Sequence, residues 1–262
     1  MKYIFSCGGG VQSTACLVLA AHGHIPYRTF IFANVGDKAE SPKTIEYIAK
    51  VLKPYAKQHG IEWVEVAKKN RNGETVDLYD DCMTNAKNVS VPLHYKYGGI
   101  GFRNCTSKWK IEPIAKWIRR NAPNCTLGVG ISTDEPHRAK PARDTDGYVK
   151  GYPLIDLGID RSGCLEIVRN EGLPKPPKSS CWFCPYHTTE SWTHRKREEP
   201  DLFAKAVELE AALCERSVML GKDPGYLTRH GLPLNICIPN QLGLFPEWLD
   251  EQDGCESGYC MT

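Results

Sequence analysis

No apolar run in this sequence approaches roughly 18 residues, the length that predicts a membrane-spanning helix. The chain also lacks an excess of charge of either sign, since 33 Lys and Arg against 31 Asp and Glu give a formal net charge of +2. Such a charge does not by itself indicate a nucleic-acid partner, so any polyanion must bind at a local patch. We expect a cytoplasmic globular protein with no membrane partner and no secretory signal.

The glycine-rich stretch near the start lacks the lysine of the Walker A motif and the spacing of the dinucleotide fingerprint. Lys2 to Ser13 reads K-Y-I-F-S-C-G-G-G-V-Q-S. Three strand-type residues, Tyr3 to Phe5, precede three glycines, and an apolar stretch to Ala21 follows. Glycines let the backbone approach a ligand closely, and the amides at a helix start attract anions. The stretch therefore predicts a phosphate-binding loop.

Cysteine, in contrast, is abundant, with twelve residues. In a chain for which no export is expected, cysteines indicate metal, redox or sulfur chemistry rather than disulfides. Cys181 and Cys184 form a C-x-x-C box before a proline, a common metal or cluster knuckle. Cys105 lies among basic residues that favour a thiolate, and Cys164 follows a capping aspartate or serine at an expected helix start. These four predict an all-sulfur site, and a zinc site in which His187 replaces Cys164 is the rival.

Strand-like and helix-like segments alternate through the first half of the chain. The strand candidates are Tyr3–Phe5, Thr29–Ala33, Ile61–Val66 and Thr126–Ile131, and the helix candidates are Ser13–Ala21, Pro42–Gln58 and Ile111–Asn121. This alternation predicts an α/β fold with a doubly wound, mostly parallel sheet. Ligands bind such sheets beyond the carboxyl ends of the strands. The loops beginning at Cys7, Asn34 and Ser132 should meet at that edge.

We predict three regions along the chain. Residues 1–150 form a nucleotide-binding domain, and residues 151–249 form a metal- or cluster-binding helical region that includes an amphipathic helix over Pro200–Leu220. Residues 250–262 form a flexible tail that carries Cys255 and Cys260.

Four sequence blocks carry most of the motifs of this chain. They are S-C-G-G-G-V-Q-S-T, A-N-V-G-D-K-A-E-S-P-K-T, R-N-C-T-S-K-W-K-I-E-P, and G-I-S-T-D-E-P-H-R with the later S-S-C-W-F-C-P. Together they resemble the phosphoadenosine phosphosulfate (PAPS) reductase family of PP-loop, N-type ATP pyrophosphatases. Gly8 stands where the family usually has its first serine, and Thr106 replaces a second tandem cysteine. The ending G-C-E-S-G-Y-C also departs from the usual E-C-G-L-H. This variant pattern is similar to phage and bacterial members.

The resemblance implies ATP and Mg²⁺ as ligands, with an iron–sulfur cluster, or zinc as the alternative, on Cys105, Cys164, Cys181 and Cys184. It places the nucleotide on Gly8, Gly9, Gly10, Gln12 and Ser13, with Asn34, Gly36, Lys110 and Asp134 completing the site. Lys108, Lys110 and Arg138 would neutralise the pyrophosphate, with Ser13 donating to it. Asp134 has a second interpretation as a cap.

Two functions follow from the resemblance. The first is an ATP pyrophosphatase that adenylylates an acceptor, such as DNA or tRNA, and receives sulfur from a donor such as a cysteine desulfurase. The second is a PAPS or adenylyl sulfate reductase with Cys260 or Cys255 as nucleophile. A third interpretation is a nucleotide-binding subunit of a larger assembly. The basic run His194–Arg197 is a candidate nucleic-acid contact or a solvated helix face. The oligomeric state is not predicted.

Overall fold

The computed structural model describes residues 2–142 and 147–238, whose contacts form two compact units. The first unit takes the described residues of Met1–Val76 and Thr106–Ser180. The second takes Asp77–Cys105 and the described residues from Cys181 onward. The chain therefore leaves the first unit after Val76, returns to it at Thr106 and leaves it again after Ser180.

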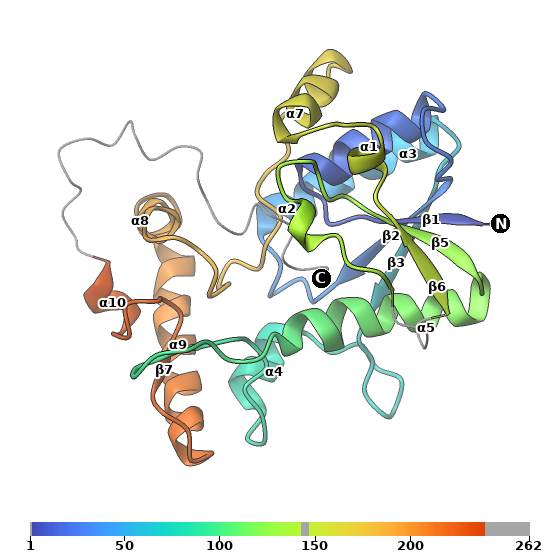
Figure 1. The fold of residues 1–262 in the computed structure, drawn as a ribbon. Helices are drawn as coiled ribbons and strands as arrows, with labels where there is room; N and C mark the ends of the chain where they lie inside the picture. Colours follow the sequence, from blue (N-terminus) through green and yellow to red (C-terminus); the bar gives the residue numbers. More distant parts are fainter. Residues whose placement is uncertain (1, 143–146, 239–262) are drawn as a thin grey trace. The chain divides into compact units, whose positions relative to one another are not determined.

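A five-stranded sheet forms the centre of the first unit, and every neighbouring pair of strands is parallel (Figure 1). The strand order is β3-β2-β1-β5-β6. The predicted α/β fold class with a parallel sheet is confirmed. Strand β6 was not predicted, because it has only four residues and ends in glycine. The strands are β1 (Tyr3–Ser6), β2 (Thr29–Asn34), β3 (Glu62–Ala67), β5 (Cys125–Val129) and β6 (Tyr148–Gly151).

The helices of the first unit largely match the predicted ranges. The predicted helix Pro42–Gln58 is continuous but has a π-helical middle, and a second π-helical segment precedes α5. Such turns are rare and are frequent at functional sites. The elements are α1 (Val11–Ala21), α2 (Pro42–Tyr47), η1 (Ile48–Leu52), α3 (Lys53–Gln58), η2 (Cys105–Ile111), α5 (Glu112–Asn121), η3 (Pro136–Arg138), α6 (Pro153–Asp156) and α7 (Arg161–Asn170).

The sheet has a hydrophobic core on each face, because successive strand side chains point to opposite sides. On β1, Phe5 packs into a core with α1, η1, α3 and α7, whereas Ile4 packs into a separate core with α5. Figure 1 shows α1, α3 and α7 on one side of the sheet and α5 on the other. Because all five strands are parallel, the loops after β1, β2, β3 and β5 leave from the same edge.

The second unit is built around the amphipathic helix α9, which spans Pro200–Met219 and so confirms the predicted helix to within one residue. Buried Glu210 accepts hydrogen bonds from the backbone N–H groups of Leu227 (2.7 Å) and Leu234 (2.5 Å). Arg216 donates to the carbonyls of Cys82 and Met83 near the end of α4. The other elements are α4 (Leu78–Thr84), β4 (His94–Tyr95), α8 (Thr189–Glu198), β7 (Gly225–Tyr226) and α10 (Leu234–Cys237). Across both described ranges, no helix combines the length and the apolar character needed to cross a membrane.

Candidate functional site

The glycine loop connects β1 to α1 and presents the start of that helix. Gly9 has a φ of +78°, which L-amino acids with side chains rarely adopt, and a methyl group there would lie 3.1 Å from the side chains of Thr44 and Ile48. Gly10 is the N-cap of α1 and offers no side chain to satisfy the first amides of the helix. These amides, together with the positive end of the helix dipole, can bind an anion.

The side chains next to the loop do not oppose an anion. Burial raises the pKa of the Cys7 thiol to about 11, so it stays protonated and neutral at physiological pH. The Ser13 hydroxyl donates to the Gly10 carbonyl at 3.0 Å, and the Thr14 hydroxyl donates to the same oxygen at 2.9 Å. Ser13 can donate to a phosphate only by rotating away from this carbonyl.

Two buried polar atoms near the loop have no hydrogen-bond partner among the described residues. They are Nε2 of Gln12, in the first turn of α1, and Oγ of Ser132, in the loop after β5. A methyl group at Gly130 would lie 3.3 Å from Cβ of Gln12, which places the β5 loop against the start of α1. Buried polar groups normally have partners, so these atoms are suited to a bound polar ligand. The glycine cradle and these donors fit a nucleotide phosphate.

A buried ion pair lies beyond β2. Lys110, predicted to bind the nucleotide, has its Nζ 3.9 Å from Oε2 of Glu40, and only 8% of Lys110 and 1% of Glu40 are exposed. The other carboxylate oxygen, Oε1 of Glu40, has no hydrogen-bond partner within the described ranges. A buried, incompletely satisfied carboxylate is costly and is common at functional sites. Sequence reasoning missed Glu40, whose only signal was its place in the block after the second strand.

In the loop after β5, Arg138 and Asp134 both contact other protein groups. Arg138 is 3% exposed and forms an ion pair with Glu135, whose pKa is raised by burial although Arg138 lowers it. Glu135 therefore already compensates part of the positive charge of Arg138. Asp134 accepts a hydrogen bond from the Arg161 N–H at 3.0 Å and so anchors the start of α7. Asp134 does not cap the segment that directly follows it, because the N-cap of η3 is Glu135 and no side chain caps that turn. The Mg²⁺ role of Asp134 stays a prediction.

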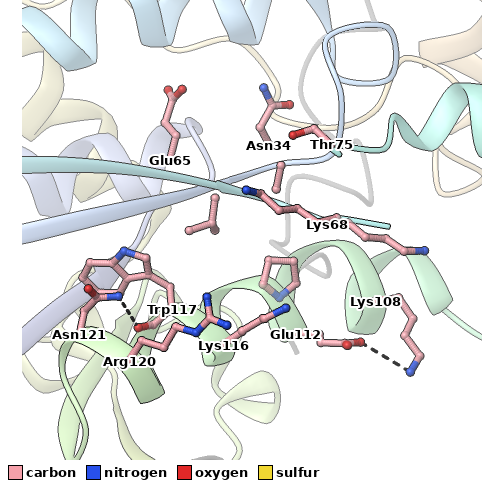
Figure 2. A pocket seen from close by; sticks show the side chains of 14 residues that line it. Asn34, Glu65, Lys68, Thr75, Lys108, Glu112, Lys116, Trp117, Arg120 and Asn121 are labelled. Atoms are coloured by element: carbon pink, nitrogen blue, oxygen red, sulfur yellow. Dashed lines mark hydrogen bonds and ion pairs between the residues drawn. The ribbon is translucent and has the colours of Figure 1, made fainter. Parts of the chain in front are cut away.

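Asn34 and Lys108 line one cavity of about 560 Å³, between β3 and α5 (Figure 2). Asn34 shapes the turn after β2, because its Oδ1 accepts from the Gly36 N–H at 2.8 Å and its Nδ2 donates to Asp37 at 2.9 Å. Gly36 has a φ of +122°, which only glycine adopts readily. Lys108 is exposed and lies 3.6 Å from Glu112. No residue of the glycine loop is among those that line this cavity.

The four predicted cysteine ligands are divided between the two units. Cys164 lies in the first unit, and Cys105, Cys181 and Cys184 lie in the second. Asp160 caps α7 as expected, yet burial, with a smaller effect of Asp134, raises the pKa of the Cys164 thiol to about 12. The expectation that a helix start lowers the pKa of this thiol is therefore wrong, because burial outweighs the helix dipole.

The C-x-x-C box forms a tight turn, in which the Cys184 N–H donates to the Cys181 carbonyl at 3.1 Å. Both ring nitrogens of His187 are engaged, with the Cys181 carbonyl at 3.0 Å and the Ser191 hydroxyl at 3.2 Å. The zinc set that includes His187 stays a prediction. Within residues 2–142 and 147–238, no three His, Cys, Asp or Glu side chains are grouped so that they could hold a metal ion. The four-cysteine site stays a prediction, and Cys255 and Cys260 lie outside the described residues.

The basic run His194–Arg197 does not form an open basic stripe. Arg195 donates to the Trp182 carbonyl and lies 3.4 Å from Glu199, and Lys196 donates to the Ile238 carbonyl at 2.7 Å. These two side chains join parts of the second unit, so half of the run is engaged within the protein. Its role as a nucleic-acid contact stays a prediction.

The structure also brings Ser179 to the glycine loop. A methyl group at Gly10 would lie 2.7 Å from Oγ of Ser179, and one at Gly8 would lie 3.7 Å from it. Sequence reasoning missed this residue, because it is separated from the loop by most of the chain. The only available signal was the serine pair between the prolines and the C-x-x-C box.

A parallel α/β sheet whose first strand leads through a glycine cradle into a helix start defines a candidate nucleotide-binding unit. No protein-family model matches the chain, and no curated protein matches it significantly.

Several solved structures are similar to it, among them the following two. PAPS reductase from Candida auris, in its phosphate complex, has a TM-score of 0.46 and 12% identity over 67% of this chain and 75% of its own. The U34-tRNA thiolase NcsA from Methanococcus maripaludis, with its [4Fe-4S] cluster, has a TM-score of 0.47 and 16% identity over 81% of this chain and 72% of its own. Both likenesses are partial, and neither gives an activity to this chain.

Proposed function

We propose that the first unit binds ATP and splits it between the α- and β-phosphates in order to adenylylate an acceptor for sulfur transfer. The glycine cradle at the start of α1 is the observation that carries this proposal, because it combines open helix amides with a neutral Cys7 thiol. The unpartnered donors Gln12 Nε2 and Ser132 Oγ support it. A triphosphate suits such a site because its charge is spread over several acceptor oxygens.

In this proposal an acceptor oxygen attacks the α-phosphorus of ATP, the bond to the β-phosphate breaks, and pyrophosphate leaves. A sulfur nucleophile then displaces AMP, which carries away the former acceptor oxygen. The loop amides of Gly9 to Ser13 would hold the pyrophosphate, and Lys108, Lys110 and Arg138 would neutralise its charge. Catalysis of this kind depends on positioning and on charge stabilisation. Mg²⁺ would add charge neutralisation.

The acceptor class in this proposal is a nucleic acid, DNA or tRNA, and the sulfur comes from a donor such as a cysteine desulfurase. An iron–sulfur cluster on Cys105, Cys164, Cys181 and Cys184 is part of the proposal as a cofactor. The tail thiols Cys255 and Cys260 favour one alternative, a PAPS or adenylyl sulfate reductase, because a reductase needs a thiolate that attacks the sulfonate.

We expect AMP and pyrophosphate to form from ATP in amounts that depend on added tRNA or DNA, because the α-phosphorus needs an acceptor oxygen. Chromatography of radiolabelled ATP products measures this directly. Sulfite released from PAPS or adenylyl sulfate with thioredoxin, and lost in Cys260→Ser, would instead establish the reductase. If the protein binds ATP but catalyses neither reaction, the remaining interpretation is a nucleotide-binding subunit of a larger assembly.

A further inference from the structure

One exposed side of the first unit, along α5, carries a row of basic side chains. Lys108, Glu112, Lys116 and Arg120 follow one another at intervals of four residues along η2 and α5, so they lie on one line of the helical surface. All four line the cavity of about 560 Å³, together with Lys68 and Lys69 where β3 ends (Figure 2). Three of the four side chains on the line are cationic.

A second cavity, of about 400 Å³, lies along the other flank of α5. Lys108 and Glu112 line both cavities, and the second adds Arg119, Lys140 and Lys150. The residues that line the two cavities are called the α5 surface below. Among the described residues they include eight basic and two acidic side chains, an excess of six positive charges within this set, whereas the whole chain has a formal charge of +2.

The two carboxylates on the α5 surface do little to neutralise it. Glu112 lies 3.6 Å from Lys108, and Glu65 lies 2.6 Å from Lys53, which is outside the surface. Neither pairing involves Lys116, Arg119 or Arg120. Trp117 also lines the larger cavity, and Figure 2 shows it beside Arg120 and Asn121, whose Nδ2 donates to the Trp117 carbonyl at 2.8 Å. Trp117 is partly buried, because it packs against the hydrophobic core beneath α5, and the rest of it faces the cavity. Cations beside a partly exposed aromatic ring match a phosphate backbone with an accessible base.

We propose that the α5 surface binds the sugar-phosphate backbone of a single-stranded segment of nucleic acid, with the exposed part of Trp117 as a contact for a base. The charge excess supplies the electrostatic attraction, and the cavity reaches Asn34, which ends β2 at the edge where the strands also end. The inference rests on the proposed function, in which the nucleic acid is the acceptor. It moves the nucleic-acid contact from the run at 194–197 to the first unit.

Fluorescence anisotropy with short, labelled RNA and DNA strands of one sequence tests this inference. The triple variant Lys116→Ala, Arg119→Ala, Arg120→Ala should bind each strand about ten-fold or more weakly. The slope of its logarithmic binding constant against logarithmic salt concentration should be smaller by about two to three, because counterion release scales with phosphate contacts. Lys57→Ala, Arg169→Ala, Lys175→Ala is the matched control, since it removes the same charge from α3, α7 and the following segment.

If both triple variants bind nucleic acid equally weakly, or if neither binds more weakly than the wild type, the proposal for the α5 surface is wrong. Comparing the RNA and DNA strands shows which of the two is preferred. ATP affinity, measured on the same samples, separates this inference from the proposed function. If the protein binds ATP but the α5 triple variant binds nucleic acid as tightly as the wild type, only the proposal for the α5 surface is wrong. If the α5 triple variant binds nucleic acid more weakly but the protein does not bind ATP, only the proposed function is wrong.

A second, independent observation concerns Ser179, whose Oγ lies over the glycine loop. The backbone on both sides of Ser179 is fixed to the start of α2. Thr44 donates to the Lys178 carbonyl at 3.2 Å, and the Ser41 N–H donates to the Ser180 carbonyl at 3.2 Å. Ser179 is therefore held beside Gly8, the position at which the PP-loop pattern usually has a serine.

We infer that the Ser179 hydroxyl donates to the bound phosphate. It would replace the hydroxyl of the serine that the PP-loop pattern usually has at the position of Gly8. This inference also rests on ATP binding at the loop. Calorimetry with a non-hydrolysable ATP analogue should show an affinity about ten-fold lower for Ser179→Ala, as expected for a hydrogen bond to a charged group. Adding Gly8→Ser to that variant should restore most of the affinity, because a Cβ at Gly8 has room.

Unchanged affinity in Ser179→Ala, with the wild-type protein binding the analogue, would overturn the inference. Weakened affinity that Gly8→Ser does not restore would overturn it too, because Ser179 would then only shape the loop. A wild-type protein that fails to bind the analogue would instead contradict the proposed function.

Discussion

Replacing Gly10 with valine should severely weaken ATP binding by the first unit. The first side-chain carbon would lie 2.7 Å from Oγ of Ser179, and the branched chain would extend over the helix amides. Losing two charge-assisted hydrogen bonds costs about 3 kcal/mol, so we expect the affinity to fall by about a hundred-fold or more. Calorimetry with a non-hydrolysable ATP analogue measures the loss, and circular dichroism with thermal unfolding shows whether the variant is folded.

Ser13→Ala is the milder variant of the same loop. It removes one hydroxyl without adding bulk, so the affinity should fall by about ten-fold. Ser162→Ala is its matched control, because Ser162 also lies in the first turn of a helix of this unit, where its hydroxyl donates to Asp160 at 2.9 Å. If folded Gly10→Val and Ser13→Ala both keep the wild-type affinity, the nucleotide does not bind at this loop.

Replacing both cysteines of the C-x-x-C box should remove the iron from the protein. Cys181 and Cys184 share one turn, and losing both would leave half of the predicted four thiolate ligands. We expect protein purified without oxygen to contain iron and sulfide and to absorb as a brown cluster. Cys181→Ser with Cys184→Ser should lose all three signals. Elemental analysis and visible absorption measure the change.

Cys214→Ser is the matched control, because this thiol lies on α9 of the same unit and is not a predicted ligand. Cys164→Ser tests the fourth ligand separately, and full retention of iron there would remove Cys164 from the set. If elemental analysis finds one zinc per chain and no iron, the site holds zinc and not an iron–sulfur cluster. Unchanged metal in the double variant would show that the C-x-x-C box is not a ligand pair.

Local patterns in the sequence were sufficient to predict the secondary structure that supports the candidate site. The strand Tyr3–Phe5, the glycines and the apolar stretch to Ala21 predicted β1, the loop and α1, because backbone freedom and hydrophobic period are local properties. Alternating strands and helices then predicted a parallel sheet and the edge where loops meet. Strand β6 was missed, because Gly151 weakens its strand signal while packing requires a small residue there: a methyl group would lie 2.6 Å from the Tyr27 hydroxyl.

The sequence by itself therefore determined the fold class, the glycine loop and the C-x-x-C box, all of which are set by residues close together in the chain. Only the tertiary structure decided which distant residues join them. Ser179 reaches Gly10, and Lys68, Lys116 and Lys150 contribute to one charged surface, although they come from different segments. The run at 194–197 was equally basic in sequence, but packing engages Arg195 and Lys196 with backbone carbonyls. A charge has a fixed place in the sequence, whereas its partners depend on how the chain folds around it.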